Sequence, residues 1–199
     1  MDTPTIRNTP LDASKDGKGP SFSLRNRLTR VVWMLTWLLL AKWTPPPLHR
    51  WRRLVLIAFG AKVGAGARVY GTTRVWLPAN LELGREVLIG PRVNLYNQGR
   101  ISIGDGSIVS QGAHVCASTH DVHDPNFQLL LRPIRIGRNC WVATEAFVGP
   151  GVAMHDRAVL GARGVLFGTA EEQGIYRGNP AMLIKHRRWP EAKRDVTSE

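Results

Sequence analysis

An aliphatic residue returns every six positions through most of the chain, and this period constrains the fold more than any other feature of the sequence. The repeated positions are Val63, Val69, Val75 and Leu81; after two-residue shifts, Leu83, Ile89, Leu95 and Ile101, then Ile103, Val109 and Val115; and after a longer interruption Ile136, Val142, Val148, Met154, Leu160 and Leu166. Neither the 3.6-residue period of a helix nor the alternation of a sandwich strand fits this pattern.

Six-residue repeats are typical of a β-solenoid, in which each hexad forms one side of a triangular coil and stacked coils enclose a continuous core. The aliphatic residue of each hexad then points inward. A glycine often follows it, as at Gly64, Gly84 and Gly104, and we expect these glycines to supply the positive φ of tight corners. The solenoid is predicted over residues 63–180, with residues 121–133 extruded from one coil as a loop.

Residues 21–62 precede the repeat and predict a helical extension rich in tryptophan and basic residues. Ser21 or Ser23 would cap its first helix, and the prolines at 45–47 would end it. Apolar residues recur there at near-helical spacing, namely Leu24, Leu28, Val31, Val32, Leu35, Leu39 and Trp43. The wholly apolar run at 31–41 is too short to cross a bilayer, and no transmembrane segment is predicted.

Two interpretations of residues 24–60 remain open. The extension could cap the hydrophobic end of the solenoid or pack in an oligomer. Alternatively, the extension could lie in the interface of an anionic membrane, with contacts from Trp33, Trp37, Trp43 and the flanking arginines. The chain would then make a peripheral membrane contact through residues 24–60.

The basic excess of the chain is concentrated at its N-terminal end. The formal net charge is +12, and residues 1–62 hold 11 Lys and Arg against 3 Asp and Glu. Residues 1–20 are polar and rich in Pro, Gly and Ser, which predicts a disordered tail; residues 181–199 form a short basic C-terminal tail. No helix-turn-helix, zinc-finger or RNA-binding motif accompanies the charge, so we expect no nucleic-acid partner. Two cysteines are too few for a disulfide scaffold.

Three segments are more specific than the repeat: VSQGAHVCASTHD (109–121), RPIRIGRNCWVATEAFVGPGV (132–152) and IYRGNPAMLIK (175–185). Together they resemble the hexapeptide-repeat acyltransferases, in particular the O-acetyltransferases of colanic-acid-type bacterial exopolysaccharide biosynthesis, over residues 22–187. The resemblance implies a mainly β protein with a left-handed parallel β-helix, although parallel crossovers in general are right-handed. It also implies acetyl-CoA as acyl donor and a homotrimer with active sites between subunits.

His120 is the general base that this resemblance implies, because it precedes the extruded loop. A sugar hydroxyl must lose its proton as it attacks the thioester, and neutral imidazole is a suitable acceptor. Asp121 would either orient His120 or cap the loop, and Glu145 is a further candidate for polarising the ring. For the acceptor, Asn94 or Asn97 could bond sugar hydroxyls, and Asp121 is counted with them among the candidate substrate-binding residues.

For CoA, the family's positions correspond to Trp141, Thr144, Ala162 and Lys185, of which Lys185 would contact the phosphates. Arg163 could serve the same end.

Metal catalysis is the main alternative for the histidines. His114, His120 and His123 could be zinc ligands, because γ-class carbonic anhydrases use this fold, but the glycine-flanked ligand pattern of that class is missing and we expect no metal. Cys116 and Cys140 occupy small-residue positions and are expected to be structural.

The sequence therefore predicts an acetyl-CoA-dependent O-acetyltransferase in the bacterial cytoplasm, with a peripheral position at the inner membrane left open. Its acceptor would be a sugar hydroxyl in an exopolysaccharide or a lipid-linked saccharide precursor. An N-acetyltransferase of a nucleotide-linked amino sugar and a non-catalytic solenoid scaffold are the alternatives.

Overall fold

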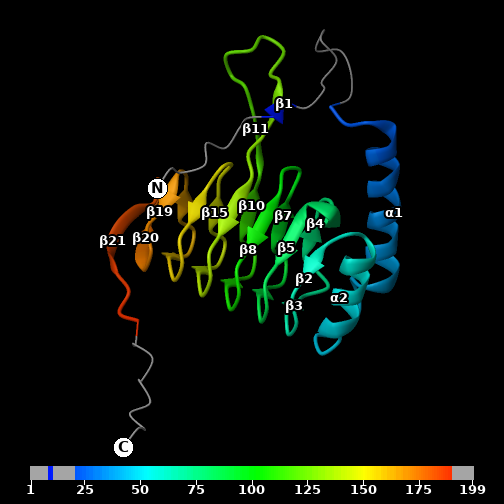
Figure 1. The fold of residues 1–199 in the computed structure, drawn as a ribbon, viewed down its shortest axis with the longest axis horizontal. Helices are drawn as coiled ribbons and strands as arrows, with labels where there is room; N and C mark the ends of the chain where they lie inside the picture. Colours follow the sequence, from blue (N-terminus) through cyan, green and yellow to red (C-terminus); the bar gives the residue numbers. More distant parts are fainter. Residues whose placement is uncertain (1–8, 11–20, 190–199) are drawn as a thin grey trace, which may run out of the picture.

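The computed structural model describes residues 9–10 and 21–189. The disordered tail expected at 1–20 and the end of the basic tail expected at 181–199 lie outside these residues, apart from β1 (Thr9–Pro10), which pairs antiparallel with β12 (Leu129–Leu131). The rest of the described chain is a solenoid of about six coils with two helices at one end (Figure 1).

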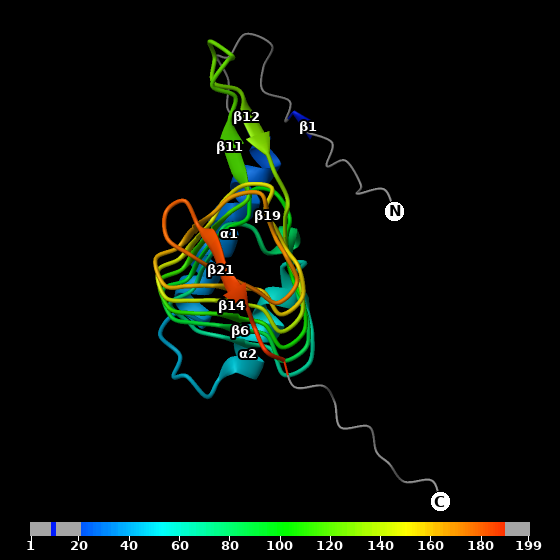
Figure 2. The same cartoon turned by 90° about the vertical axis from the view of Figure 1, so that its left-hand side faces the viewer.

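Three parallel sheets form the sides of the solenoid, and Figure 2 looks along its stacked coils. Sheet I holds β2 (Lys62–Val63), β5 (Leu81–Leu83), β8 (Ile101–Ile103), β13 (Ile134–Ile136), β16 (Ala153–Met154) and β19 (Thr169–Ala170). Sheet II holds β3 (Arg68–Val69), β6 (Leu88–Ile89), β9 (Ile108–Val109), β14 (Trp141–Val142), β17 (Val159–Leu160), β20 (Gly174–Arg177) and β21 (Met182–His186), the last antiparallel. Sheet III holds β4 (Arg74–Val75), β7 (Asn94–Tyr96), β10 (His114–Cys116), β15 (Phe147–Val148) and β18 (Val165–Leu166), and a 3-10 turn, η1 (Pro78–Asn80), joins β4 to β5.

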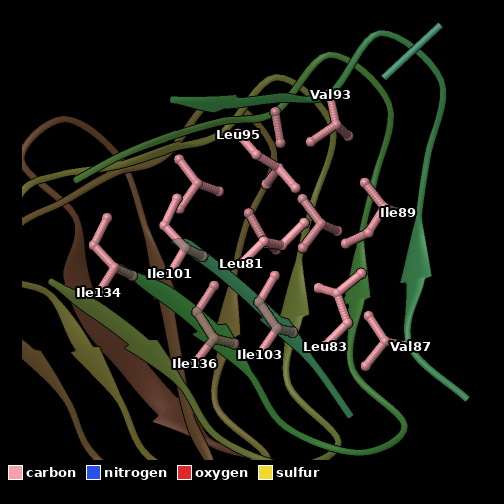
Figure 3. Packing of buried hydrophobic residues seen from close by; sticks show 14 of the residues in the cluster. Leu81, Leu83, Val87, Ile89, Val93, Leu95, Ile101, Ile103, Ile134 and Ile136 are labelled. Carbon is pink, nitrogen blue, oxygen red and sulfur yellow. The ribbon is translucent and has the colours of Figure 1, made fainter. Parts of the chain in front are cut away.

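The repeated aliphatic residues form the core, as the period predicted. All seventeen positions are buried. They stack in register from coil to coil, because Val63 pairs with Leu83, Leu83 with Ile103 and Ile103 with Ile136 along sheet I. Figure 3 shows part of this core, in which repeat residues such as Leu83 and Ile103 pack inside the coils together with Val87 and Val93. The predicted parallel β-helix is confirmed.

The glycines after the aliphatic residues have a different role from the one expected. Gly64 and Gly104 do not have positive φ. Instead, a Cβ on Gly64 would lie 2.5 Å from the backbone nitrogen of Arg85, and one on Gly104 would lie 2.7 Å from the carbonyl carbon of Gly137. The left-handed residue comes two positions later, as at Gly66 (φ 70°). Close approach of successive coils, not corner conformation, therefore requires the first glycine.

The extruded loop is a β-hairpin that projects from the side of the solenoid (Figure 1). Its strands are β11 (Ser118–His120) and β12. They pair antiparallel, with His120 opposite Leu129. The hairpin thus carries His120 just outside the stacked coils.

Two helices, α1 (Leu24–Leu40) and α2 (His49–Ala58), cover the first coil (Figure 1). Ser23 caps α1 as expected, its hydroxyl accepting from the Asn26 N–H at 3.3 Å. Trp33 and Trp37 are buried, and their indole N–H groups donate to the carbonyls of Val75 (2.7 Å) and Gly71 (3.0 Å). The capping interpretation is confirmed, and the placement of these two tryptophans in a membrane interface was wrong.

The link between the helices is held by Arg52. Its side chain is fully buried. The guanidinium donates to the hydroxyl of Thr44 (2.7 Å) and to the carbonyls of Pro46 and Val69 (both 2.6 Å). The charge thus satisfies carbonyls of the proline-rich link, since prolines leave them without the partners a continuing helix would supply.

Candidate active site

A hollow of about 530 Å³ surrounds His120 at the base of the hairpin. Its walls include four elements: the first turns of α1 with Arg27 and Arg30, the end of β7 with Tyr96, β10 with Cys116, and β11 with His120. Both arginines were treated in the sequence only as flanking charges. The position of Arg30 could have been inferred from Trp33, which is buried and lies one helical turn later on the same side of α1. Arg30 therefore faces the solenoid, and its guanidinium lies 3.9 Å from the centroid of the Trp76 ring.

The His120 ring is held by the hairpin backbone. Its Nδ1 lies 2.6 Å from the carbonyl oxygen of Phe127. A carbonyl only accepts, so Nδ1 carries the proton and the neutral ring has its lone pair on Nε2. That is the tautomer a general base requires.

Within the described part of this chain, the acidic side chains near the loop bond to groups other than His120. The Asp121 carboxylate accepts from the backbone N–H of His123 at 3.0 Å, which caps the hairpin loop. Glu145 pairs with Arg163 at 2.7 Å in this chain, and its expected role in polarising His120 stays a prediction. Arg163, which was a candidate phosphate ligand in the sequence, is the partner of Glu145 in this ion pair.

The positions expected to bind CoA lie on the outer side of sheet II. Trp141, Val159, Ile175 and Lys185 are in register on successive strands. Trp141 is half exposed and its indole N–H donates to the Ser110 hydroxyl at 2.9 Å, while Lys185 is exposed. Thr144 and Ala162 each follow by two residues the paired Val142 and Leu160, so they occupy equivalent corners of adjacent coils. We call the row from Trp141 to Lys185 the sheet II row.

The structure does not bring the sheet II row to His120 within one chain. The residues that line the His120 hollow do not include Trp141, Lys185, Thr144 or Ala162. In one chain these residues and His120 form two separate sets, whereas the resemblance in the sequence implied sites between subunits.

The two candidate acceptor residues differ in accessibility. Asn97 is fully buried; its amide oxygen accepts from the backbone N–H of Trp76 (2.9 Å) and its amide nitrogen donates to the Leu77 carbonyl (2.6 Å). A buried structural amide cannot contact an acceptor, so the expectation for Asn97 was wrong. Asn94 lines a second hollow of about 840 Å³, which shares its Tyr96 wall with the first.

His114 and Cys140 have structural surroundings. His114 stacks edge-on between Tyr96 and Phe147, and burial lowers its pKa. No group of three metal-ligating side chains occurs among the described residues. Burial raises the pKa of Cys140 to about 11, which keeps it a thiol.

Comparison with known proteins shows the family to which the chain belongs. No protein-family model matches it. WcaF of Escherichia coli K12, assigned as a colanic acid biosynthesis acetyltransferase, is 37% identical over 162 residues, which cover 81% of this chain and 89% of WcaF. The chain belongs to the hexapeptide-repeat acetyltransferases. This membership overturns the scaffold interpretation.

Solved structures share the fold of this acetyltransferase. A maltose O-acetyltransferase from Clostridium difficile superposes with a TM-score of 0.76 at 20% identity, covering 84% of this chain and 90% of its own. A galactoside acetyltransferase in complex with coenzyme A gives a TM-score of 0.76 at 20% identity, covering 90% and 93%. Among the described residues of the acetyltransferase, no helix has the length and apolar character to cross a membrane.

Proposed function

We propose that the chain transfers an acetyl group from acetyl-CoA to a hydroxyl of a sugar in a bacterial surface polysaccharide or its lipid-linked precursor, in the cytoplasm, with His120 as general base. The observation that carries the proposal is the bond between His120 Nδ1–H and the Phe127 carbonyl. It fixes the tautomer in which Nε2 can accept a proton. The similarity to WcaF over most of both chains supports the substrate class.

The chemistry assigned to His120 is proton removal from the attacking hydroxyl. As Nε2 takes this proton, the hydroxyl oxygen gains the nucleophilicity it lacks near neutral pH, and the imidazolium can return the proton to the leaving thiolate. A backbone N–H of an adjoining coil would stabilise the oxyanion of the tetrahedral intermediate. Transfer is direct and forms no acyl-enzyme, which agrees with the buried, protonated Cys140.

The sheet II row fits an elongated acyl donor that ends in phosphates. Along the row Trp141 is exposed, Val159 is buried, Ile175 is partly exposed, and the exposed Lys185 lies at its end. When bound there, acetyl-CoA supplies the activated acyl group as a thioester. Because this row and the His120 hollow are separate in one chain, we propose that a neighbouring chain joins them, in a homotrimer with three sites between subunits.

The experiment is an acetyl-transfer screen of the purified chain with acetyl-CoA. The acceptors are free sugars, lipid-linked saccharides and nucleotide-linked amino sugars, and the product is identified by mass. Mild alkali removes an O-acetyl group and leaves an N-acetyl group. We expect an alkali-labile acetyl group on a lipid-linked or free saccharide, and an alkali-stable product on the amino sugar alone would contradict the proposal.

The matched variants are His120→Ala and His123→Ala, two histidines of the same hairpin. Replacing His120 should lower kcat by about 10² to 10⁴, whereas replacing His123, whose described bond uses only its backbone N–H, should leave kcat nearly unchanged. Unaltered circular dichroism and sedimentation would show that both variants fold. Retained turnover in the folded His120→Ala variant would exclude His120 as the base.

A further inference from the structure

The helices at the start of the solenoid leave a large apolar surface exposed. Fourteen of the twenty-two exposed large hydrophobic side chains in the described residues lie between Leu24 and Ile57. They are Leu24, Leu28, Val31, Val32, Met34, Leu35, Leu38, Leu39, Leu40, Trp43, Leu48, Trp51, Leu54 and Ile57. We call this set the helical apolar face. A patch of this kind on a soluble domain marks an interaction surface.

The face is continuous because α1 uses only one narrow stripe for packing. Trp33, Trp37 and Ala41 are buried against the first coil. The residues between them, such as Leu35 (53% exposed) and Leu39 (63% exposed), point away from it. Figure 1 shows α1 at the outer end of the solenoid, with α2 beside its lower end. The indole bonds of Trp33 and Trp37 hold α1 there, so its exposed side is a fixed feature of the fold.

The charge around this face has one sign. Residues 21–62 contain eight Lys and Arg and no Asp or Glu. Three of the eight are used within the chain, since Arg52 bonds carbonyls, Arg53 donates to the Val63 and Gly64 carbonyls, and Lys62 pairs with Glu82. The other five, Arg25, Arg27, Arg30, Lys42 and Arg50, make no ion pair within the described residues.

We propose that the helical apolar face inserts into the surface of an anionic membrane, with Arg25, Lys42 and Arg50 against the lipid phosphates. Apolar side chains would enter the headgroup boundary while the basic residues stay at its charged surface. A second copy of the chain docking by the same face would bring cations against cations with no acid to offset them. The occupant to which the charge is complementary is therefore the lipid surface.

The position of the His120 hollow agrees with this orientation. Arg27 and Arg30 of α1 line the hollow, and Leu24, Leu28 and Val31 on the same turns belong to the helical apolar face. A chain lying on its helices would hold the hollow at the edge of the membrane surface. This inference does not depend on the proposed reaction, and its test uses no acceptor.

The test is co-sedimentation of the full chain with vesicles of phosphatidylcholine alone or with phosphatidylglycerol. We expect binding to the anionic vesicles that weakens as salt rises. The double variant Leu35→Glu/Leu39→Glu should bind at least about tenfold more weakly, because two side chains that would be buried become charged. Met182→Glu places the same charge at a hydrophobic residue that is exposed (63%) at the other end of the chain, and it should bind like the wild type.

A second variant pair keeps the proposal falsifiable if the first does not fold. Arg25→Gln/Arg50→Gln should reduce the preference for anionic vesicles, and Arg135→Gln/Arg177→Gln, two exposed arginines of the solenoid, should not. Failure of the wild type to bind anionic vesicles would overturn the proposal. A second result would also overturn the proposal: Leu35→Glu/Leu39→Glu binds vesicles like the wild type but has a different oligomeric state in sedimentation velocity. The face would then be an interface between copies of the chain.

Discussion

At the scale of single residues, the backbone controls the chemistry of the candidate base. His120 gets its tautomer from the Phe127 carbonyl, while the neighbouring Asp121 is used to close the loop. The sequence predicted the position of His120 from the motif before the loop. It could not predict the carbonyl, because any residue supplies one and only the hairpin geometry brings that of Phe127 within 2.6 Å.

Residue identity alone was also a poor guide to which asparagine is accessible. Asn94 and Asn97 are three positions apart and equally polar. The difference comes from the chain fold: Asn97 sits at a coil corner where the backbone of Trp76 and Leu77 needs partners. Buried backbone groups are almost always satisfied, and here a side chain satisfies them.

His114 predicts how stability depends on pH. Burial lowers its pKa from the usual 6.5, so in mild acid the unfolded chain binds a proton that the folded chain does not. Stability should therefore decline as pH falls below about 6.5 and until the lower folded pKa is reached. His49, whose pKa burial also lowers, adds to the same trend.

Urea denaturation between pH 7.5 and 5 measures this effect. His114→Phe keeps an aromatic ring between Tyr96 and Phe147 and removes the titrating group, so its unfolding free energy should fall less over this range than that of the wild type. An identical pH dependence in the two proteins would show that His114 does not contribute.

At the scale of elements, the hexad specified the solenoid almost completely. Every repeated aliphatic residue is buried because its side chain points into the coil, next to a second inward residue two positions earlier, such as Val87 before Ile89. The helices were harder. The spacing of Leu24, Leu28, Val32, Leu35 and Leu39 identified a helix, yet this apolar stripe is exposed and Trp33 and Trp37 form the packed side. Periodicity identifies the apolar sides of a helix, but it does not show which of these sides packs against the rest of the protein.

The glycines that follow some of the repeated aliphatic residues give a prediction at this scale. Gly104→Ala should destabilise the chain by about 1–3 kcal/mol, because its Cβ meets the backbone of the next coil and rigid stacking prevents relief. Gly168→Ala is the control. Gly168 has positive φ (73°) and open space around its Cβ position, so its cost of about 1 kcal/mol is conformational only. A chemical denaturation series in which Gly104→Ala costs less than Gly168→Ala would contradict the close-approach explanation.

At the scale of the whole molecule, one chain carries the two candidate sets of site residues apart from each other. The His120 hollow lies between the hairpin and α1, and the sheet II row runs from Trp141 to Lys185. A proton acceptor and an acyl donor must meet within hydrogen-bond distance of one hydroxyl. The family resemblance implied sites between subunits, but the sequence could not show which candidate residues lie together in one chain, since motifs do not report distances.

Co-expression of two inactive variants measures the central claim that a base from one chain works on a donor held by its neighbour. One chain carries His120→Ala and the other carries Trp141→Ala/Lys185→Ala, and acetyl transfer is assayed on the purified mixed oligomer. If sites form between chains, random assembly should restore about a quarter of wild-type activity, because each site needs an intact half from each of two chains. Mixed oligomers that form and stay as inactive as either variant alone would contradict the claim.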